Sequence, residues 1–208
     1  RKLPIITQLA KASGRKIGIV SSVSIDHATP AAFYAHAAGR SVYYGIALQL
    51  AESGFDFFAG GGLKKPKGDK GDQPDAFEAI AKAGYAITRT RDDFLKLNAS
   101  SGKVMAVNPV LDRDKALSYE IDRKDGEITL AEFTAKGIEL LDNPNGFFMM
   151  VEGGKIDWAC HANDAVASIR DTVAFDDAVR VALDFCKKHP DETLVVVLAD
   201  HETGGMSI

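Results

Sequence analysis

The chain has 208 residues, of which 46% are hydrophobic and 26% are charged, a composition typical of a globular domain and unlike that of a disordered chain. Its formal net charge of −4 excludes the strongly basic character of most nucleic-acid-binding proteins, so we expect no nucleic acid as a partner. No apolar run approaches the ~20 residues of a transmembrane helix, and we expect no membrane span. Cys160 and Cys186 are too few for a disulfide framework.

The length suits a single α/β domain over residues 1–208. The N-terminal residues show neither the apolar region nor the cleavage site of a signal peptide, and the chain does not begin with Met. A new apolar segment also begins after Gly205. These features predict that the chain is an internal fragment of a longer protein.

In chain order, apolar runs of strand length alternate with longer segments of helical period. The expected elements are a helix over 4–12, a strand over 17–23, helices over 30–38 and 43–52, a strand over 55–59, a helix over 75–83, a strand over 85–88, a helix over 92–97, a strand over 104–107, a helix over 130–141, a strand over 147–151, a helical stretch over 161–188 and a strand over 194–199. A break in the last helical stretch is expected near Asp171-Thr172. The alternation predicts an α/β fold with three αβα layers and a largely parallel central sheet.

Two segments depart from this rhythm. Residues 111–128 form a predicted surface insertion, in which Leu117 to Ile121 alternate like an exposed strand and Lys124-Asp-Gly-Glu resembles a turn. The run Gly60-Gly61-Gly62 follows a strand, as a phosphate-binding loop would. It lacks the Gly-Lys-Ser/Thr continuation and a helix directly behind it, so a tight turn is the preferred interpretation.

Chemistry-bearing residues follow the two most apolar strands. Glu152, Asp157 and His161 come after the strand at 147–151, and Asp200-His201 comes after the strand at 194–199. Ligands of parallel sheets gather at the carboxyl ends of strands, and Asp157 and His161 share one face if they lie on a helical turn. Carboxylate and imidazole suit zinc, whereas the oxygen donors of Glu152 and Thr29 suit magnesium. The pattern predicts a metal site.

Each of these residues also has an ordinary structural interpretation. Asp157 with His161 could be a surface or capping pair, His27 a loop histidine, and Arg40 a helix-terminal cation. His36 and His189 have no nearby partners in the sequence and are interpreted as structural. Two acid–imidazole pairs at two strand ends, each beside two glycines, rarely arise together by chance. The metal interpretation is therefore preferred.

With these residues identified, the sequence resembles the alkaline phosphatase family. Three stretches carry the resemblance: His27-Ala-Thr-Pro-Ala-Ala with Arg40, Val151-Glu-Gly-Gly-Lys-Ile-Asp157 with His161, and Ala199-Asp-His-Glu-Thr-Gly-Gly. The resemblance implies that Asp157 and His161 bind one zinc ion and that Asp200 and His201 bind a second. It also implies that Thr29 and Glu152 bind one magnesium ion.

The same resemblance implies hydrolysis of small-molecule phosphate monoesters through a phosphoserine intermediate, with Arg40 holding two phosphate oxygens. His27 and Trp158 stand where some family members have Asp and Lys, near the magnesium and phosphate sites. We expect both to contact the substrate and to alter metal affinity and product release rather than the type of reaction. No serine here stands in the nucleophile context, so we expect the fragment alone to be inactive. A periplasmic or secreted location is implied, and a homodimer is left open.

Two alternatives stay open on the sequence. A related enzyme with the same metal scaffold could be a phosphodiesterase, a sulfatase or a phosphopentomutase. The chain could also be a metal-binding protein without catalytic activity.

Overall fold

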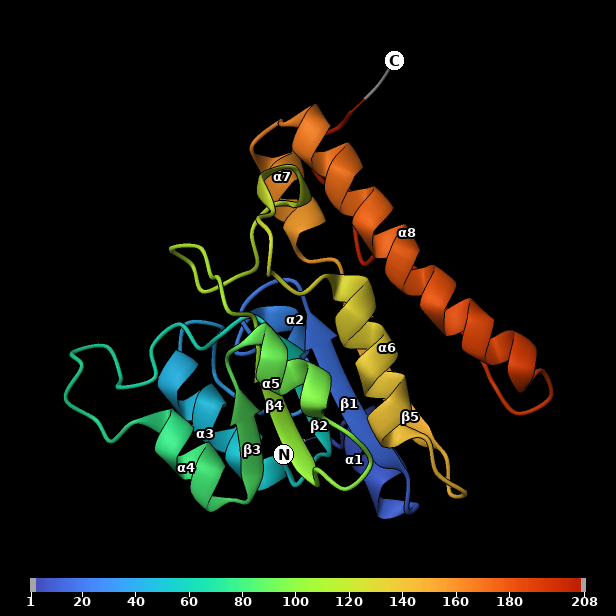
Figure 1. Cartoon of the computed structure of the whole chain (residues 1–208). Coiled ribbons are helices and arrows are strands. Elements are labelled where there is room, and N and C mark those ends of the chain that lie inside the picture. Colours follow the sequence, from blue (N-terminus) through green and yellow to red (C-terminus); the bar gives the residue numbers. More distant parts are fainter. Residues whose placement is uncertain (1–2, 207–208) are drawn as a thin grey trace.

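The structure, a computed structural model, describes residues 3–206, and its centre is a five-stranded sheet in which every neighbouring pair of strands is parallel. The strands are β1 (Lys16–Ser21), β2 (Phe57–Gly60), β3 (Tyr85–Thr88), β4 (Lys103–Val107) and β5 (Phe147–Glu152). Their order across the sheet is β3-β4-β2-β1-β5, so β1 lies between β2 and β5 (Figure 1). Five of the six predicted strands are confirmed.

Helices cover both faces of this sheet (Figure 1). They are α1 (Ile6–Ala12), α2 (Ala28–Ala32), α3 (Tyr43–Ser53), α4 (Ala76–Lys82), α5 (Arg91–Lys96), the 3-10 turn η1 (Glu120–Asp122), α6 (Leu130–Leu141), α7 (Lys155–His161) and α8 (Ala165–Lys188). One apolar core joins the sheet to α2, α3 and α4, and a second joins its other face to α5, α6 and α8. The predicted three-layer αβα fold is confirmed.

The central strands are apolar along their length because both of their faces are covered. Ile17, Ile19 and Val20 of β1 have no exposed surface. The carboxyl ends of β1, β2 and β5 lie level, since Ser21 is in register with both Gly60 and Glu152. A Cβ on Gly60, whose φ is 128°, would lie 1.8 Å from the Ser21 carbonyl oxygen. The glycine run thus allows close chain packing where β2 ends, and Gly61 lies in a bend rather than in a hydrogen-bonded turn.

The helix predicted over 30–38 is shorter than expected and begins earlier, as α2. Its N-cap residue is His27, and Thr29 lies in the first turn. The helix does not continue because Gln49 of α3 binds both the amide (2.8 Å) and the carbonyl (3.1 Å) of His36. The Gln49 side chain thus binds the backbone groups of His36 that would form hydrogen bonds within a longer helix.

The break predicted at Asp171-Thr172 is also wrong. Both residues lie inside α8, and Thr172 donates its hydroxyl hydrogen to the Ser168 carbonyl at 2.8 Å, which satisfies it within the helix. The chain breaks instead between α7 and α8, where Asn163 has φ of 53° and Asp164 accepts a hydrogen bond from the Ala167 amide. Because of this break, α7 is a separate helix that follows the carboxyl end of β5.

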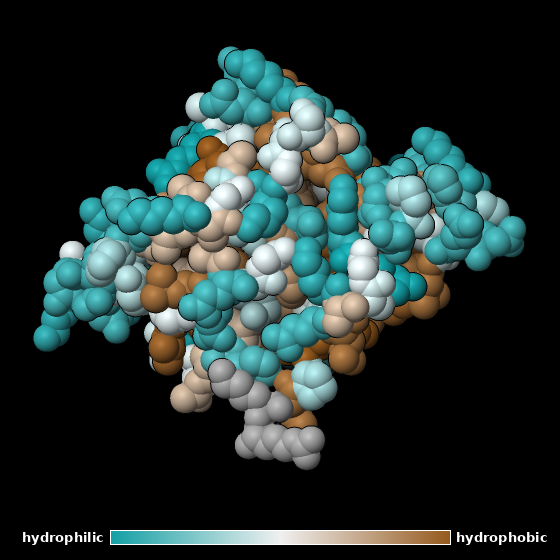
Figure 2. Space-filling view, turned by 90° about the horizontal axis from the view of Figure 1, so that it is seen from below, coloured by the Kyte–Doolittle hydropathy of each residue, from teal (hydrophilic) through white to brown (hydrophobic). Residues whose placement is uncertain are grey.

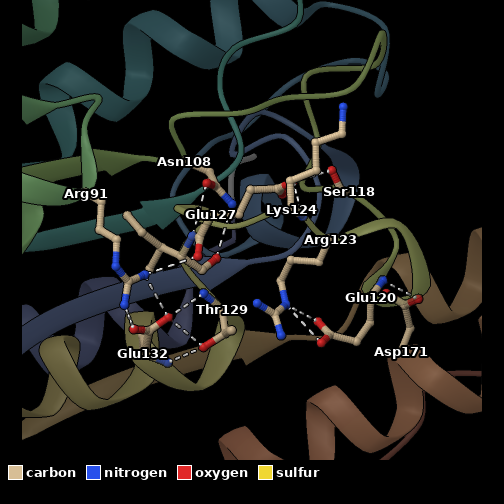
Figure 3. A network of polar contacts seen from close by, with 11 residues as sticks. Arg91, Asn108, Ser118, Glu120, Arg123, Lys124, Glu127, Thr129, Glu132 and Asp171 are labelled. Atoms are coloured by element: carbon tan, nitrogen blue, oxygen red, sulfur yellow. Dashed lines mark hydrogen bonds and ion pairs between the residues drawn. The ribbon is translucent and has the colours of Figure 1, made fainter.

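Residues 111–128 contain no strand, so the strand-like alternation of Leu117 to Ile121 was misleading. The expected turn is present and includes Gly126, whose φ is 88°. The segment is closed at its base by Asn108, whose amide group exchanges two hydrogen bonds with the backbone of Ile128 (Figure 3). It contacts α8 through the Glu120 amide, which donates to Asp171 at 3.2 Å (Figure 3). These tertiary contacts replace strand pairing.

The strand predicted over 194–199 is likewise wrong. Its residues pair with no strand in the part of the chain that the structure describes, and Leu194 and Leu198 are 87% and 70% exposed. An apolar run becomes a strand only when it pairs, and here β5 remains an edge strand. Apolar side chains also reach the surface on the side shown in Figure 2. The apolar segment expected after Gly205 falls partly on residues 207 and 208, outside the described residues.

Within residues 3–206, none of the helices combines the length and the apolar character needed to cross a membrane.

Candidate metal and phosphate site

A single open groove of about 1960 Å³ runs from the carboxyl end of β5 along α7 and α8 to the segment after α8. It is lined by every residue that the sequence predicts for the site: His27, Thr29, Arg40, Glu152, Asp157, Trp158, His161, Asp200 and His201. These residues come from four separate stretches of the chain. The fold thus gathers them on one surface.

Asp157 and His161 lie on one face of α7, as the i,i+4 spacing predicts. The distance from Asp157 Oδ1 to His161 Nε2 is 3.4 Å, and both side chains are open to solvent. α7 is fixed at its start because the Lys155 amide donates to Ser22 Oγ at 3.1 Å. The pair is therefore carried by a helix that is bonded to the end of β1.

Asp200 and His201 form a second pair of the same kind. Asp200 Oδ2 lies 3.3 Å from His201 Nε2. The hydroxyl of Thr203 lies 3.0 Å from His201 Nδ1 and donates to Asp157 Oδ1 at 2.9 Å. Thr203 therefore connects the two acid–imidazole pairs, although they are distant in sequence.

Glu152 ends β5 and lies deeper in the groove than the two pairs. Burial raises the pKa of the Glu152 carboxyl, whereas the hydroxyls of Ser21 and Thr29 oppose the rise. The negative charges of Asp200 and Asp157 raise the pKa further. The carboxylates of Glu152, Asp157 and Asp200 thus lie close enough to influence one another, and a bound cation would relieve their repulsion.

His27, Arg40 and Trp158 form the other side of the groove. The His27 and Trp158 rings meet edge to face with their centroids 5.6 Å apart. Arg40 Nη2 lies 3.5 Å from His27 Nε2. Burial, followed by the positive charge of Arg40, lowers the pKa of His27 to about 4. A neutral imidazole beside an exposed guanidinium leaves the positive charge of Arg40 available to an anion.

The donor atoms fit zinc in kind and in spacing. Two ligands of a tetrahedral zinc ion, each about 2.0–2.1 Å from the metal, lie about 3.3 Å from one another. The two acid–imidazole pairs have donor separations of 3.4 Å and 3.3 Å. Across residues 3–206, however, no three or more His, Cys, Asp or Glu side chains converge as a metal-binding group. Each pair thus supplies two donors, and zinc takes three or four.

Sequence reasoning missed two residues that support the site. Ser21 donates a hydrogen bond to Glu152 Oε2, and Thr203 joins the pairs as described above. Thr203 stands inside the Asp200-His-Glu-Thr-Gly-Gly stretch that the sequence had already singled out, so its position was a usable signal. Ser21 could be found only once β1 and β5 are known to be neighbours.

Comparison with known proteins agrees with this geometry. The model of the alkaline phosphatase family matches residues 1–208. The chain belongs to the alkaline phosphatase family. Alkaline phosphatase 3 of Bacillus subtilis (strain 168) is 37% identical over 210 residues, which cover 98% of this chain and 43% of that protein. The alkaline phosphatase of Escherichia coli (strain K12) is 31% identical, over 95% of this chain and 51% of its own length.

Solved structures of the same family share the fold. The alkaline phosphatase of the Antarctic bacterium TAB5 is 34% identical, with a TM-score of 0.79 over 91% of this chain and 54% of its own. A histidine-to-glutamate mutant of the TAB5 enzyme was solved with Mg bound in its M3 site. The chain spans about half the length of the relatives that it matches.

Proposed function

We propose that the protein to which this chain belongs hydrolyses phosphate monoesters in a metal-dependent reaction. The observation that carries the proposal is that two acid–imidazole pairs, the partly buried Glu152 carboxylate and Arg40 line one groove. Family membership supports the same reaction class.

We assign Asp157 and His161 to one zinc ion, Asp200 and His201 to a second, and Glu152 with Thr29 to a magnesium ion. The donor spacings support the zinc assignments, and the mutual repulsion of the carboxylates supports a cation beside Glu152. When bound, such ions act as Lewis acids that stabilise negative charge on the reacting phosphate. Thr203 orients Asp157 and His201 through its hydroxyl.

Arg40 binds the phosphate group in this proposal. Its planar guanidinium can donate two parallel hydrogen bonds to phosphate oxygens, and its charge is permanent. His27, neutral near pH 7, holds Arg40 from the side without competing for the anion. Trp158 packs against His27 and closes the same wall of the groove.

The experiment compares hydrolysis of p-nitrophenyl phosphate, bis(p-nitrophenyl) phosphate and p-nitrophenyl sulfate by the full-length protein. We expect the monoester to be the preferred substrate. Arg40→Ala should lower kcat/KM for the monoester by about 10²-fold, as removal of one charge-stabilising donor does elsewhere. Arg180→Ala, which removes an exposed arginine of α8, is the matched control. Preferential turnover of the diester or the sulfate would favour the alternative enzyme classes.

The nucleophile is assigned to no residue of this chain, and the 208 residues alone are expected to hydrolyse little or no phosphate ester. Turnover by the purified 208-residue chain that disappears in His161→Ala would contradict this expectation. The periplasmic or secreted location remains a prediction from the resemblance.

A further inference from the structure

Lys155 is a deeply buried charged side chain near the groove. It begins α7, two residues before Asp157, and only 1% of its surface is exposed. Its ammonium group forms an ion pair with Asp112 Oδ2 at 2.7 Å. Burying a charge costs several kcal/mol unless it is well paired, so a lysine at this position calls for a physical explanation.

Backbone hydrogen bonds orient the Asp112 carboxylate, independently of its contact with Lys155. Asp112 Oδ1 accepts hydrogen bonds from the amides of Asp114 (2.8 Å) and Ala116 (3.0 Å). The next residue, Leu117, donates its amide to the Ser22 carbonyl at 2.9 Å. The turn that holds Asp112 is therefore bonded to the end of β1, where the Lys155 amide is also bonded.

Two aromatic rings complete the surroundings of the ammonium group. Lys155 Nζ lies 3.8 Å from the ring centroid of Tyr119 and 4.8 Å from that of Trp158. Both distances are within the ~6 Å range of cation–π attraction. One side of the Trp158 indole thus meets Lys155, and the indole in turn meets His27, which contacts Arg40. A continuous set of contacts leads from Asp112 to the phosphate-facing wall.

We infer that Lys155 is a positioning residue, which holds the Trp158 ring against His27 and thereby maintains the wall of the groove that contains Arg40. An apolar residue could fill the same volume, but it would not attract two aromatic faces and an oriented carboxylate at once. The consequence for substrate binding rests on the proposed function. The positioning of Trp158 does not.

The test uses Lys155→Met, which keeps the unbranched shape and removes the charge. Lys103→Met is the matched control, because Lys103 Nζ also lies over an aromatic ring, 4.7 Å from the Tyr85 centroid, at the opposite end of the sheet. Trp158 is the only tryptophan of the chain, so tryptophan fluorescence reports on the surroundings of this one ring. Acrylamide quenching of the 208-residue chain should increase about twofold in Lys155→Met, since the Trp158 ring loses the cation that holds it in place. Lys103→Met should leave quenching unchanged.

In the full-length protein, Lys155→Met should raise KM for p-nitrophenyl phosphate about fivefold while kcat stays within about twofold, as expected for lost ground-state positioning. The double variant Lys155→Met/Asp112→Asn removes both charges of the ion pair and should recover much of the melting temperature lost in the single variant. We expect its quenching and its KM to stay altered.

Unchanged quenching in Lys155→Met would overturn the inference whether or not the full-length protein hydrolyses phosphate monoesters. Altered quenching with an unchanged KM would overturn its link to substrate binding. Recovery of quenching and KM together with stability in the double variant would show that Lys155 acts only on stability.

Discussion

The two acid–imidazole pairs of the groove have the same chemistry but different structural support. Asp157 and His161 lie on α7, which is bonded to β1 through Ser22 and to the 111–128 segment through Lys155. Asp200 and His201 follow a segment without regular structure. The first pair is fixed by the fold, whereas the second depends on local contacts with α7.

The close approach of Gly204 to α7 is the most restrictive of these contacts. The φ angle of Gly204 is 85°, and a Cβ at this position would lie 2.5 Å from the Cys160 carbonyl oxygen. The backbone can approach α7 only because residue 204 has no side chain. Identical ligand types can thus be positioned either by a rigid helix or by a single permissive residue.

The largest effect is expected from the helix-borne pair. His161→Ala in the full-length protein should lower kcat/KM for p-nitrophenyl phosphate on the order of 10³-fold, since a catalytic metal contributes several kcal/mol. Steady-state kinetics with zinc supplied would measure it. His189→Ala is the control, because His189 follows α8 and packs on Phe185. Full activity in His161→Ala would remove His161 from the zinc assignment.

A smaller loss of activity is expected when the contact of Gly204 with α7, which positions Asp200 and His201, is disturbed. Gly204→Ala should reduce activity by about 10- to 100-fold, the range typical when supporting contacts of metal ligands are lost. Gly205→Ala is the matched control: its φ of 62° brings similar backbone strain, but a Cβ there meets nothing within 4 Å. Kinetics and zinc content of both variants would be compared. Equal losses in the two would mean that strain, not contact with α7, explains the effect.

The role of the Asp171 carboxyl, which accepts a hydrogen bond from the Glu120 amide, can be tested through the stability of the chain. Burial raises the pKa of Asp171 to about 6 from 3.8, so between about pH 4 and pH 6 the folded chain holds more protons than the unfolded chain. The protonated Asp171 carboxyl therefore stabilises the folded chain at low pH, and this stabilisation is lost as pH rises from about 4 to about 6. Asp171→Asn keeps an acceptor for the Glu120 amide and should increase the free energy of unfolding at pH 8 by about 2 kcal/mol.

Urea unfolding of the 208-residue chain at pH 4, 6 and 8 would check this prediction. Asp177→Asn, at an exposed position of the same helix, is the control. Burial also raises the pKa of Asp26 to about 6, so part of the pH dependence should persist in Asp171→Asn. A variant less stable than the parent at pH 8 would show that the Asp171 charge stabilises the fold.

Local patterns predicted much of the fold and most of the candidate site. The strands at β1 and β5 and the helix at α6 follow from short-range periodicity, and the shared face of Asp157 and His161 follows from their spacing. Contacts between distant residues could not be predicted in this way. Lys155 meets Asp112 across 43 positions, and no local pattern of either residue indicates the other.

The errors have two different origins. The predicted break at Asp171-Thr172 ignored a hydrogen bond within the helix, and the predicted strand at 194–199 assumed a partner strand. Helical structure depends mainly on nearby residues, whereas a strand requires pairing with another segment. The strand prediction was therefore the less secure of the two.

The smallest effect on stability is expected in the 194–199 segment, where the predicted strand is absent. Leu198 is 70% exposed, so Leu198→Ser should change the stability of the 208-residue chain by less than about 0.5 kcal/mol. Ile19→Ala, at a fully buried position of β1, should cost about 2–5 kcal/mol in the same urea titration. If both variants lost similar stability, the 194–199 segment would have to pack like a core strand in solution. The second acid–imidazole pair would then be supported by the sheet, and the contrast between the two pairs would disappear.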